Sequence, residues 1–558
     1  FSVYLGSVFT LAALMYLYLP ITTLLTSPGE IGIHLEYLLT ENLESAMVVV
    51  YLAALFYGLA LTARMKTVLA AVALVGLAIG AFYAYVLPFG YPMMNGLTFE
   101  QIPLPAGQLL LRVGVDLLIC AALAVAVVFA IFKLGGKRVL IGIVLLNTSL
   151  VAASVMSVRR DATAGPEKEQ GEGTEERRPL VLTTAKNNVL VLFLDRFMGG
   201  FVEGILEQEP SLAARLDGFT WYPRTLAAGE NSIAGLHPLL GGYDYMPREM
   251  DRRDRPLREL SAESYAILPY NFIDAGYRAS FVNPRGLGFT VSGDCRFLDI
   301  EGLNCTHTPL SLSKRMAEDY GMPVRALAKS NYADLLVLLG AMRATPYLSR
   351  AVVRERGPWR PFLDHSAGTT FREWAELKAL AELTRIDEGA PSLNILFNNL
   401  PHEPYYLNEE CLPQRSRPGY TAAELKARGA DNVFELQHRI AARCALVLLA
   451  DYFAWMREQG VYDNTMIVIV SDHGIVGPVR DRSSRAVAGG TVDNAFVRSR
   501  SVLFVKPAGA RGPLRISEEF MPNAEVPRIV CEEIGGCVNP YLDDKPIAAD
   551  GRRLPFYV

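Results

Sequence analysis

Five long apolar stretches occupy the first 158 residues, and they constrain the fold more than any other feature of the sequence. A helix of about 20 residues crosses the roughly 30 Å hydrocarbon core of a bilayer, so each stretch is long enough to span one. The first stretch is too long and apolar for a cleaved signal peptide. Because the chain begins at Phe1 rather than Met, we expect a short piece to precede it. The predicted spans are approximately Ser2–Thr26, Ala46–Ala63, Thr67–Pro88, Leu109–Phe132 and Val139–Val158.

The charges between these spans predict their orientation. Basic residues lie in the turns at 64–66 and 133–138, whereas the other two connections carry acidic residues and no Lys or Arg. Basic turns face the cytoplasm, and five spans then place everything after Val158 on the outer side. Near the outer end of the fourth span, Arg112 and Asp116 lie one helical turn apart. They could pair with each other or reach the interface.

Composition separates the rest of the chain from this region. Of 558 residues, 51% are hydrophobic, and the mean hydropathy is +0.21. The apolar excess lies before residue 158, and the remainder reads like a globular protein rather than a disordered one. A net charge of −4 gives no indication of nucleic-acid binding. Residues 159–186 are charged and contain Gly, as linkers do. We therefore predict a transmembrane domain at 1–158, a linker at 159–186 and an extracytoplasmic domain at 187–558.

Six of the seven cysteines follow the last predicted span, and Cys120 lies within the fourth. An even number outside the membrane is typical of an oxidising compartment. Six cysteines allow many connectivities, and their spacing fits no zinc finger. We expect local pairs between Cys295 and Cys305, Cys411 and Cys444, and Cys531 and Cys537.

From Asn187 onward, apolar runs of strand length alternate with helical segments. This alternation is typical of an α/β domain with a mostly parallel central sheet covered on both faces. The predicted strands are Val189–Leu194, Ala279–Val282, Leu393–Phe397, Met466–Val470 and Val502–Val505. The predicted helices include Leu260–Ala275, Trp374–Arg385 and Phe434–Gln459.

Polar residues follow three of these strands. Asp195 follows the first, His402 lies just after the third, and Asp472 and His473 follow the fourth. Ligands of open parallel sheets gather outside the carboxyl ends of the strands, so these residues are expected to share one edge. Carboxylate and imidazole ligands suit a divalent cation such as Zn²⁺ or Mn²⁺. Alternatively, a single Asp forms a turn or cap, and a lone His makes a loop hydrogen bond.

At these residues the sequence resembles the alkaline phosphatase and sulfatase superfamily. The likeness is greatest to its membrane-anchored branch, which includes lipoteichoic-acid synthases and lipid A phosphoethanolamine transferases. Residues 188–195 resemble the opening strand with the first metal ligand, and 470–474 resemble the second ligand pair. Residues 275–282 resemble the helix-to-strand step of the superfamily, and 401–405 the substrate-side His segment. The resemblance implies five membrane helices followed by a sulfatase-like α/β domain.

The resemblance also implies a nucleophile. Sulfatase-like proteins carry it about ten residues before a Gly that closes a short Leu-Leu run, and here Gly242 closes such a run and Ser232 precedes it by that distance. A Ser at the start of a helix benefits from backbone N–H groups that stabilise a phosphorylated oxygen. As an alternative, Ser232 only caps the helix. The implied metal site comprises Asp195, Ser232, Asp472 and His473.

Two departures from the branch affect this assignment. Its transferases usually carry Thr as nucleophile and Glu as first acid, whereas this chain has Ser232 and Asp195. Ser is competent, since alkaline phosphatases use it, and no Cys near Ser232 could become the formylglycine of sulfatases. No His follows His473 to complete a second metal site, so we expect one divalent metal.

The resemblance implies a phosphotransferase in the bacterial cytoplasmic membrane. It would move a phospholipid head group, phosphoethanolamine or phosphoglycerol, to a cell-surface glycan or lipid through a phosphoserine at Ser232. His402 would hold the phosphate or protonate the leaving oxygen. Two alternatives stay open: a membrane-bound phosphodiesterase or phosphatase that uses water as acceptor, and a non-catalytic lipid sensor or scaffold. The presence of Ser232 and all three metal ligands argues against the sensor.

Overall fold

The computed structural model divides into two compact units, one of apolar helices and one with an α/β fold. In the described part of the first unit, four helical stretches are long and apolar enough to cross a membrane, judged by length and composition. The helices of this unit are α1 (Ser2–Ala13), α2 (Leu19–Thr26), α3 (Leu35–Leu59), α4 (Ala63–Ala81), α5 (Ala106–Ala162) and α12 (Tyr332–Arg343). The structure describes all residues except 27–34, 88–105, 163–177, 285–297, 299, 323–331, 348, 351–352, 354–366, 475–493 and 548–558.

The long helix α5 contains both the fourth and the fifth predicted spans. Its apolar part, Gly107–Ala153, has 47 residues, which at 1.5 Å per residue is about 70 Å, more than twice the thickness of a bilayer core. Gly135 interrupts it with φ 74° and ψ 160°, in the region that favours glycine. The predicted pair of spans is therefore present as two helices that meet at Gly135 within the basic turn.

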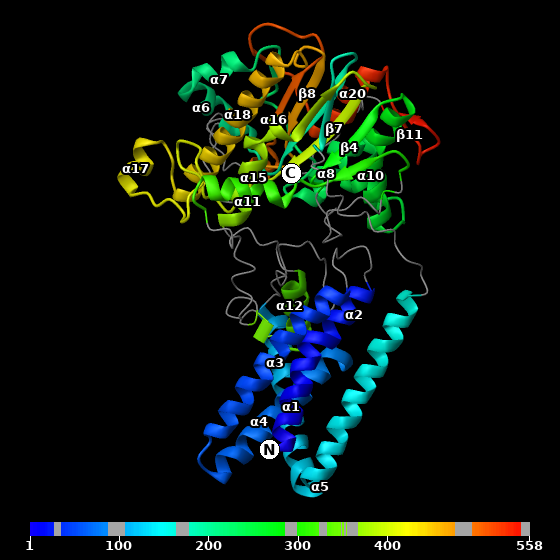
Figure 1. Cartoon of the computed structure of the whole chain (residues 1–558), viewed down its shortest axis with the longest axis vertical. Coiled ribbons are helices and arrows are strands. Elements are labelled where there is room, and N and C mark those ends of the chain that lie inside the picture. Colours follow the sequence, from blue (N-terminus) through cyan, green and yellow to red (C-terminus); the bar gives the residue numbers. More distant parts are fainter. Residues whose placement is uncertain are drawn as a thin grey trace. The chain divides into compact units, whose positions relative to one another are not determined.

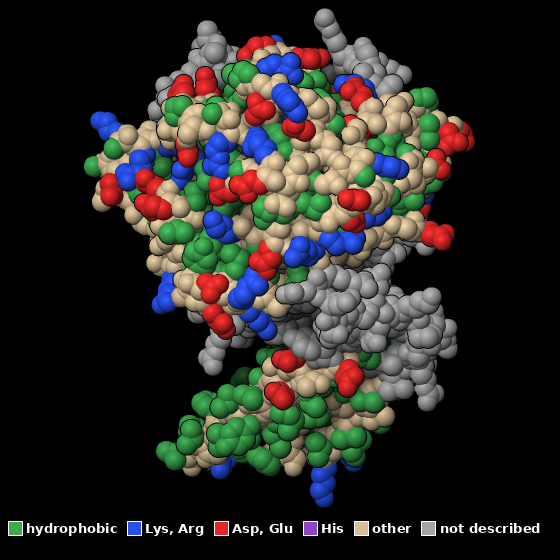
Figure 2. Space-filling view, turned by 45° about the horizontal axis from the view of Figure 1, so that its top comes forward, with side chains coloured by type: hydrophobic (Ala, Val, Ile, Leu, Met, Phe, Trp, Pro, Cys, Tyr) green, Lys and Arg blue, Asp and Glu red, His purple; other side chains and the backbone are tan. Residues whose placement is uncertain are grey.

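Hydrophobic side chains predominate on the face of the first unit that Figure 2 shows. Large side chains such as Leu59, Leu110, Leu118 and Phe132 are more than half exposed. Exposed apolar surface on this scale is unfavourable in water and is typical of a face that contacts lipid. The first unit thus has the surface expected of a membrane domain.

Asp116 has a structural role within this unit. It pairs with Arg112, Nε to Oδ1 at 3.8 Å, as expected from their spacing. It also accepts hydrogen bonds from the Tyr83 hydroxyl and the Tyr347 backbone N–H, each at 2.7 Å. Tyr347 lies just after α12, which comes from the middle of the chain. A carboxylate among apolar helices needs such partners, and these bind the α12 segment to the apolar helices.

The second unit is built on an eight-stranded sheet. The strand β9 runs antiparallel to both of its neighbours and the other pairs are parallel, so the predicted mostly parallel sheet is confirmed. In sheet order the strands are β10 (Arg515–Ile516), β3 (Thr220–Trp221), β9 (Leu503–Lys506), β8 (Thr465–Val470), β2 (Asn188–Leu194), β7 (Ser392–Asn398), β4 (Arg278–Val282) and β5 (Asn304–Thr306).

Helices cover both faces of this sheet (Figure 1). On β2, Leu190, Leu192 and Leu194 belong to a buried cluster with α15 and α18. Phe193 points to the opposite face, where its ring meets Phe397, which stacks on Tyr265 of α10. A strand buried on both faces is apolar throughout. The longer helices are α8 (Ser232–Gly241), α10 (Leu257–Asp274), α11 (Leu310–Asp319), α15 (Ala367–Lys378) and α18 (Val433–Glu458).

The remaining elements are short. Two further pairs of strands lie outside the main sheet: β1 (Leu180–Thr183) with β6 (Thr384–Asp387), and β11 (Val538–Asn539) with β12 (Lys545–Pro546). The short helices are α6 (Val202–Gln208), α7 (Pro210–Arg215), α9 (Pro247–Asp251), α16 (Leu380–Leu383), α17 (Ala422–Ala427), α19 (Asn494–Ser499) and α20 (Val526–Cys531).

All five predicted strands are present within one residue of their expected ends, but one predicted helix is present only in part. The helix predicted at Trp374–Arg385 overlaps the end of α15 and all of the short α16, and the chain enters β6 at Thr384. The strand that pairs with β6 is β1, which lies in the segment predicted to be a linker. A four-residue strand needs a partner from elsewhere in the chain, and local sequence patterns do not reveal that partner.

Two of the expected disulfides are confirmed, Cys411 with Cys444 and Cys531 with Cys537. Cys120 is a free cysteine. The pair expected between Cys295 and Cys305 involves Cys295, which is outside the described residues.

A buried polar cluster aligns the starting ends of the central strands. The side chain of Asn188, fully buried, accepts hydrogen bonds from the Thr183 N–H at 2.8 Å and the Ser392 hydroxyl at 2.9 Å. Its amide donates to the Thr183 carbonyl at 2.9 Å and to Thr465 Oγ1 at 3.3 Å. One side chain therefore connects β1, β2, β7 and β8.

We predict that Asn188→Ala lowers the free energy of unfolding by about 3 kcal/mol, because it leaves several buried polar groups without partners. The thermal midpoint of the full chain in detergent measures this. Lys186→Ala, on an exposed neighbour, should leave the midpoint unchanged. Equal midpoints for both variants would show that the cluster does not stabilise the sheet.

Candidate functional site

The carboxyl ends of three adjacent strands form one edge of the sheet. The strands β8, β2 and β7 are neighbours and parallel, with Phe193 opposite Val470 and Leu194 opposite Asn398. Asp472 therefore leaves the sheet beside Asp195, and the segment with His402 follows on the other side. The predicted shared edge is confirmed for these three segments.

Asp195, Asp472 and His473 converge there, and each is buried. Each offers one ligand atom, and these atoms lie within 4.8 Å of one another. The Nε2 atom of His473 is 3.9 Å from Asp195 Oδ1 and 3.5 Å from Asp472 Oδ2. Among the residues that the structure describes, neither of these two carboxylate oxygens has a hydrogen-bond partner. Buried charged oxygens without partners are costly unless a cation or proton lies between them.

Hydrogen bonds orient these ligands toward one point. The Nδ1 atom of His473 donates to the Gly474 carbonyl at 2.7 Å, which leaves the Nε2 lone pair facing the carboxylates. The other oxygen of Asp472 accepts from the backbone N–H groups of Arg196, at 3.2 Å, and His473, at 2.9 Å. Asp472 and His473 are thus each held by one side-chain atom and present another.

Burial has opposite effects on the acids and the imidazole. It raises the pKa of the Asp195 and Asp472 carboxyls, and it lowers the pKa of His473 to about 4. A neutral imidazole beside carboxylates is the form that binds a metal, and a bound cation repays the burial of the two charges. The donor set therefore fits a divalent cation.

Ser232 lies at this site and is the first residue of helix α8. Its Oγ is 3.3 Å from His473 Nε2. The N-cap of α8 is Asn231, whose side chain accepts from the Ala234 N–H at 3.1 Å. The alternative that Ser232 is the cap is therefore wrong, and its hydroxyl faces the ligand cluster.

Two residues that sequence patterns did not indicate set this arrangement. A Cβ on Gly235 would overlap the carbonyl oxygen of Asp472, so only glycine allows α8 to approach the ligand turn this closely. The buried Asn523 donates to the carbonyls of Gly235, at 3.1 Å, and Asp472, at 3.3 Å. Gly235 lies in the helix that follows Ser232, but nothing in the sequence around Asn523 signals its role.

His402 lies close enough to the ligands to be among the electrostatic influences on the pKa values of Asp195, Asp472 and His473. Its Nδ1 donates to the Glu403 carbonyl at 2.7 Å. The Glu403 side chain forms an ion pair with Arg196.

Comparisons with known proteins identify similar folds at low identity. No family profile and no curated protein matches the chain. An alkaline phosphatase superfamily protein of Vibrio parahaemolyticus is 14% identical and matches over 63% of this chain and 67% of that one, with a TM-score of 0.35. Phosphonate monoester hydrolase of Agrobacterium radiobacter is 16% identical, over 63% and 74%, with a TM-score of 0.31.

The integral membrane protein lipooligosaccharide phosphoethanolamine transferase A of Neisseria meningitidis is 12% identical. It matches over 90% of this chain and 88% of that one, with a TM-score of 0.32.

We predict that the chain binds Zn²⁺ or Mn²⁺ through this cluster. After chelation and titration of the full chain in detergent, Asp472→Asn should weaken metal affinity more than about 100-fold, beyond what loss of a supporting partner costs. The matched variant Asp451→Asn changes an exposed acid on α18 and should bind as the wild type does. Equal affinity in the two variants would exclude Asp472 as a ligand.

Gly235→Ala should push α8 away from Asp472. We expect the free energy of unfolding to fall by about 1–3 kcal/mol, together with metal affinity. The control is Gly204→Ala in α6, where a Cβ has open space and should be neutral or slightly stabilising. Thermal midpoints and metal titration compare the two, and wild-type behaviour of Gly235→Ala would mean that the close approach is unimportant.

Proposed function

We propose that this chain is a metal-dependent phosphotransferase of the alkaline phosphatase and sulfatase superfamily. It moves a phospholipid head group, phosphoethanolamine or phosphoglycerol, to a cell-surface glycan or lipid. The observation that carries the proposal is the position of Ser232 Oγ, 3.3 Å from His473 Nε2 and beside two buried carboxylate oxygens that have no partner among the described residues. A hydroxyl next to a set of metal-binding atoms is the arrangement that a nucleophile needs.

Asp195, Asp472 and His473 would hold one divalent cation, Zn²⁺ or Mn²⁺, with the Ser232 hydroxyl facing it. When bound, such a cation favours ionisation of a nearby hydroxyl and offsets the negative charge that develops on phosphate oxygens. The buried position of the ligands excludes water and strengthens these effects.

The chemistry then proceeds in two displacements. Ser232 Oγ bonds to phosphorus, the bond from phosphorus to the glycerol oxygen of diacylglycerol breaks, and overall the Ser232 proton passes to that leaving oxygen. His402 holds the phosphate or gives a proton to that leaving oxygen. An acceptor hydroxyl next bonds to the same phosphorus, and the phosphoserine ester breaks to restore Ser232. Backbone N–H groups at the start of α8 favour the phosphorylated state.

The apolar helices support a donor that resides in the bilayer. We place the chain in the bacterial cytoplasmic membrane with the α/β unit on the outer side, because the basic turns favour that orientation. The Cys411–Cys444 and Cys531–Cys537 disulfides are consistent with an oxidising compartment.

We predict that Ser232→Ala abolishes head-group transfer, by at least about 1,000-fold, while zinc content stays near that of the wild type. The assay follows label from the head group of phosphatidylethanolamine or phosphatidylglycerol in vesicles that contain the full chain. Ser211→Ala, exposed on α7, is the matched control and should be fully active.

The destination of the label separates the alternatives. Label on a second lipid or glycan supports the transferase, and label released to water supports a hydrolase. Undiminished activity in Ser232→Ala would exclude the covalent step. A wild-type chain that is loaded with zinc and converts no lipid would favour the sensor or scaffold.

A further inference from the structure

Arg196 directly follows the ligand Asp195 and has an uncommon backbone conformation. Its φ of 62° lies in the left-handed region that L-residues other than glycine rarely adopt. Such a conformation persists when surrounding contacts impose it. Arg196 has three contacts of this kind, and each reaches a different segment of the α/β unit.

The backbone of Arg196 is held from both sides. Its N–H donates to Asp472 Oδ1 at 3.2 Å, which connects the turn after β2 to the turn after β8. Its carbonyl accepts from His438 Nε2 at 2.9 Å, which connects the same turn to α18. The turn with Asp195 is thus joined to a second metal ligand and to a helix of the scaffold.

His438 is a rigid partner for that carbonyl. It is fully buried, stacks on Tyr405 at 5.3 Å and meets the edge of Phe201 at 5.0 Å. Burial lowers its pKa to about 3, so the ring is neutral and its one N–H is directed to Arg196.

The side chain of Arg196 reaches the third segment. Its guanidinium forms an ion pair with Glu403, the neighbour of His402, and only 13% of the side chain is exposed. Burial would raise the pKa of Glu403, but the charges of His402 and Arg196 lower it to about 2, so the acid is ionised. One guanidinium nitrogen is therefore paired with a carboxylate, while Nε has no hydrogen-bond partner among the described residues.

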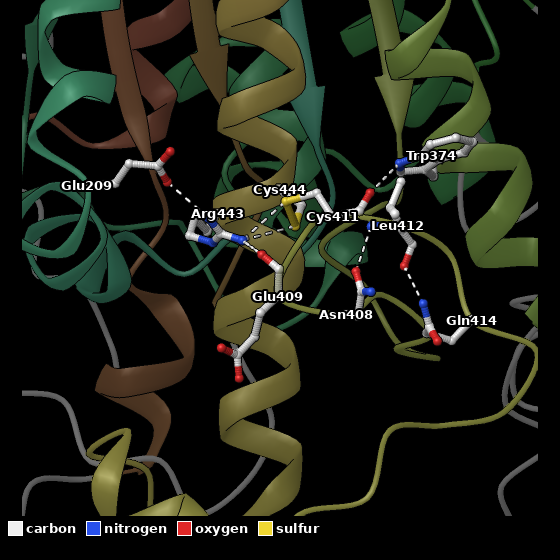
Figure 3. Close-up of a disulfide and its surroundings, with 9 residues drawn as sticks. All are labelled: Glu209, Trp374, Asn408, Glu409, Cys411, Leu412, Gln414, Arg443 and Cys444. Atoms are coloured by element: carbon white, nitrogen blue, oxygen red, sulfur yellow. Dashed lines mark hydrogen bonds and ion pairs between the residues drawn. A yellow bond between two sulfur atoms is a disulfide. The ribbon is translucent and has the colours of Figure 1, made fainter.

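The far end of the His402 segment is anchored to the same scaffold (Figure 3). The Cys411–Cys444 disulfide joins it to α18, and Trp374 Nε1 donates to the Cys411 carbonyl at 2.8 Å. Arg443 contacts both sulfur atoms and pairs with Glu209 at 3.0 Å. This disulfide holds the far end of the segment, and the Arg196–Glu403 pair contacts its near end, which follows β7.

We propose that Arg196 is a positioning residue that holds the Asp195–Asp472 ligand pair and the His402 segment in one fixed arrangement, acting through Glu403 and not on the substrate phosphate. This inference rests on the proposed function, because it assigns a role within that site. It differs from a phosphate clamp, in which the guanidinium would have to leave Glu403.

Metal affinity distinguishes positioning from simple charge. If Arg196 acts only through its charge, Arg196→Gln removes a positive charge near the cation and tightens binding, whereas Glu403→Gln weakens it. If the pair positions the ligands, both variants weaken binding. Because both substitutions break the same contact, the double variant binds the metal no more weakly than the weaker-binding of the two single variants.

The experiment is a zinc titration of the metal-free full chain in detergent for the wild type, Arg196→Gln, Glu403→Gln and the double variant. We expect each variant to lose about 10-fold in affinity, the double variant to match the singles, and Arg196→Lys to recover most of the loss. Where transfer is measured, kcat should fall and KM should stay within about threefold. Arg215→Gln and Asp451→Asn, which break an exposed ion pair, are the controls.

Opposite changes in affinity for the two single variants, or losses that multiply in the double variant, would overturn the proposal. So would a rise in KM in Arg196→Gln alone, which would identify a phosphate contact. These outcomes are separate from the proposed function. Zinc affinity, and the energetic coupling between the Arg196 and Glu403 substitutions, can be measured even in a chain that transfers no head group.

Discussion

The parallel pairing of β8, β2 and β7 is the constraint on which the site depends. These strands are buried on both faces, so their backbone groups must pair with one another and their register cannot shift without exposing apolar side chains. Asn188 joins their starting ends through four hydrogen bonds. Because the polar cluster fixes the starting ends of these strands, the three polar segments that follow β8, β2 and β7 lie at a defined spacing at the other end of the sheet.

The second constraint is the close approach of α8 to the ligand turn. Gly235 allows backbone to meet backbone at Asp472, and Asn523 bridges both carbonyls. These main-chain contacts thereby fix the position of the helix that carries Ser232, the candidate nucleophile. The charges at the site are also unbalanced: Asp195, Asp472 and Glu403 are acids and Arg196 is the base paired with one of them. The uncompensated acids match the charge of a divalent cation.

The two units use buried charge in different ways. In the apolar unit, Asp116 is saturated by the Tyr83 hydroxyl, the Tyr347 N–H and Arg112, and so contributes cohesion. In the α/β unit, Asp195 and Asp472 each retain an oxygen that has no partner in the described part of the chain. Buried charge with complete partners is structural, whereas incomplete partners indicate a place for a ligand.

Local pattern was sufficient for the membrane helices, the central strands and the disulfides of Cys411 and Cys531, because apolar periodicity and spacing are properties of short segments. It also predicted that Asp195, Asp472 and His473 lie at one edge, because parallel strands must end together. It could not predict β1 with β6, the contacts of Asn523, or the three contacts of Arg196. Those depend on pairs of residues far apart in sequence, and only the folded chain brings them within hydrogen-bond distance.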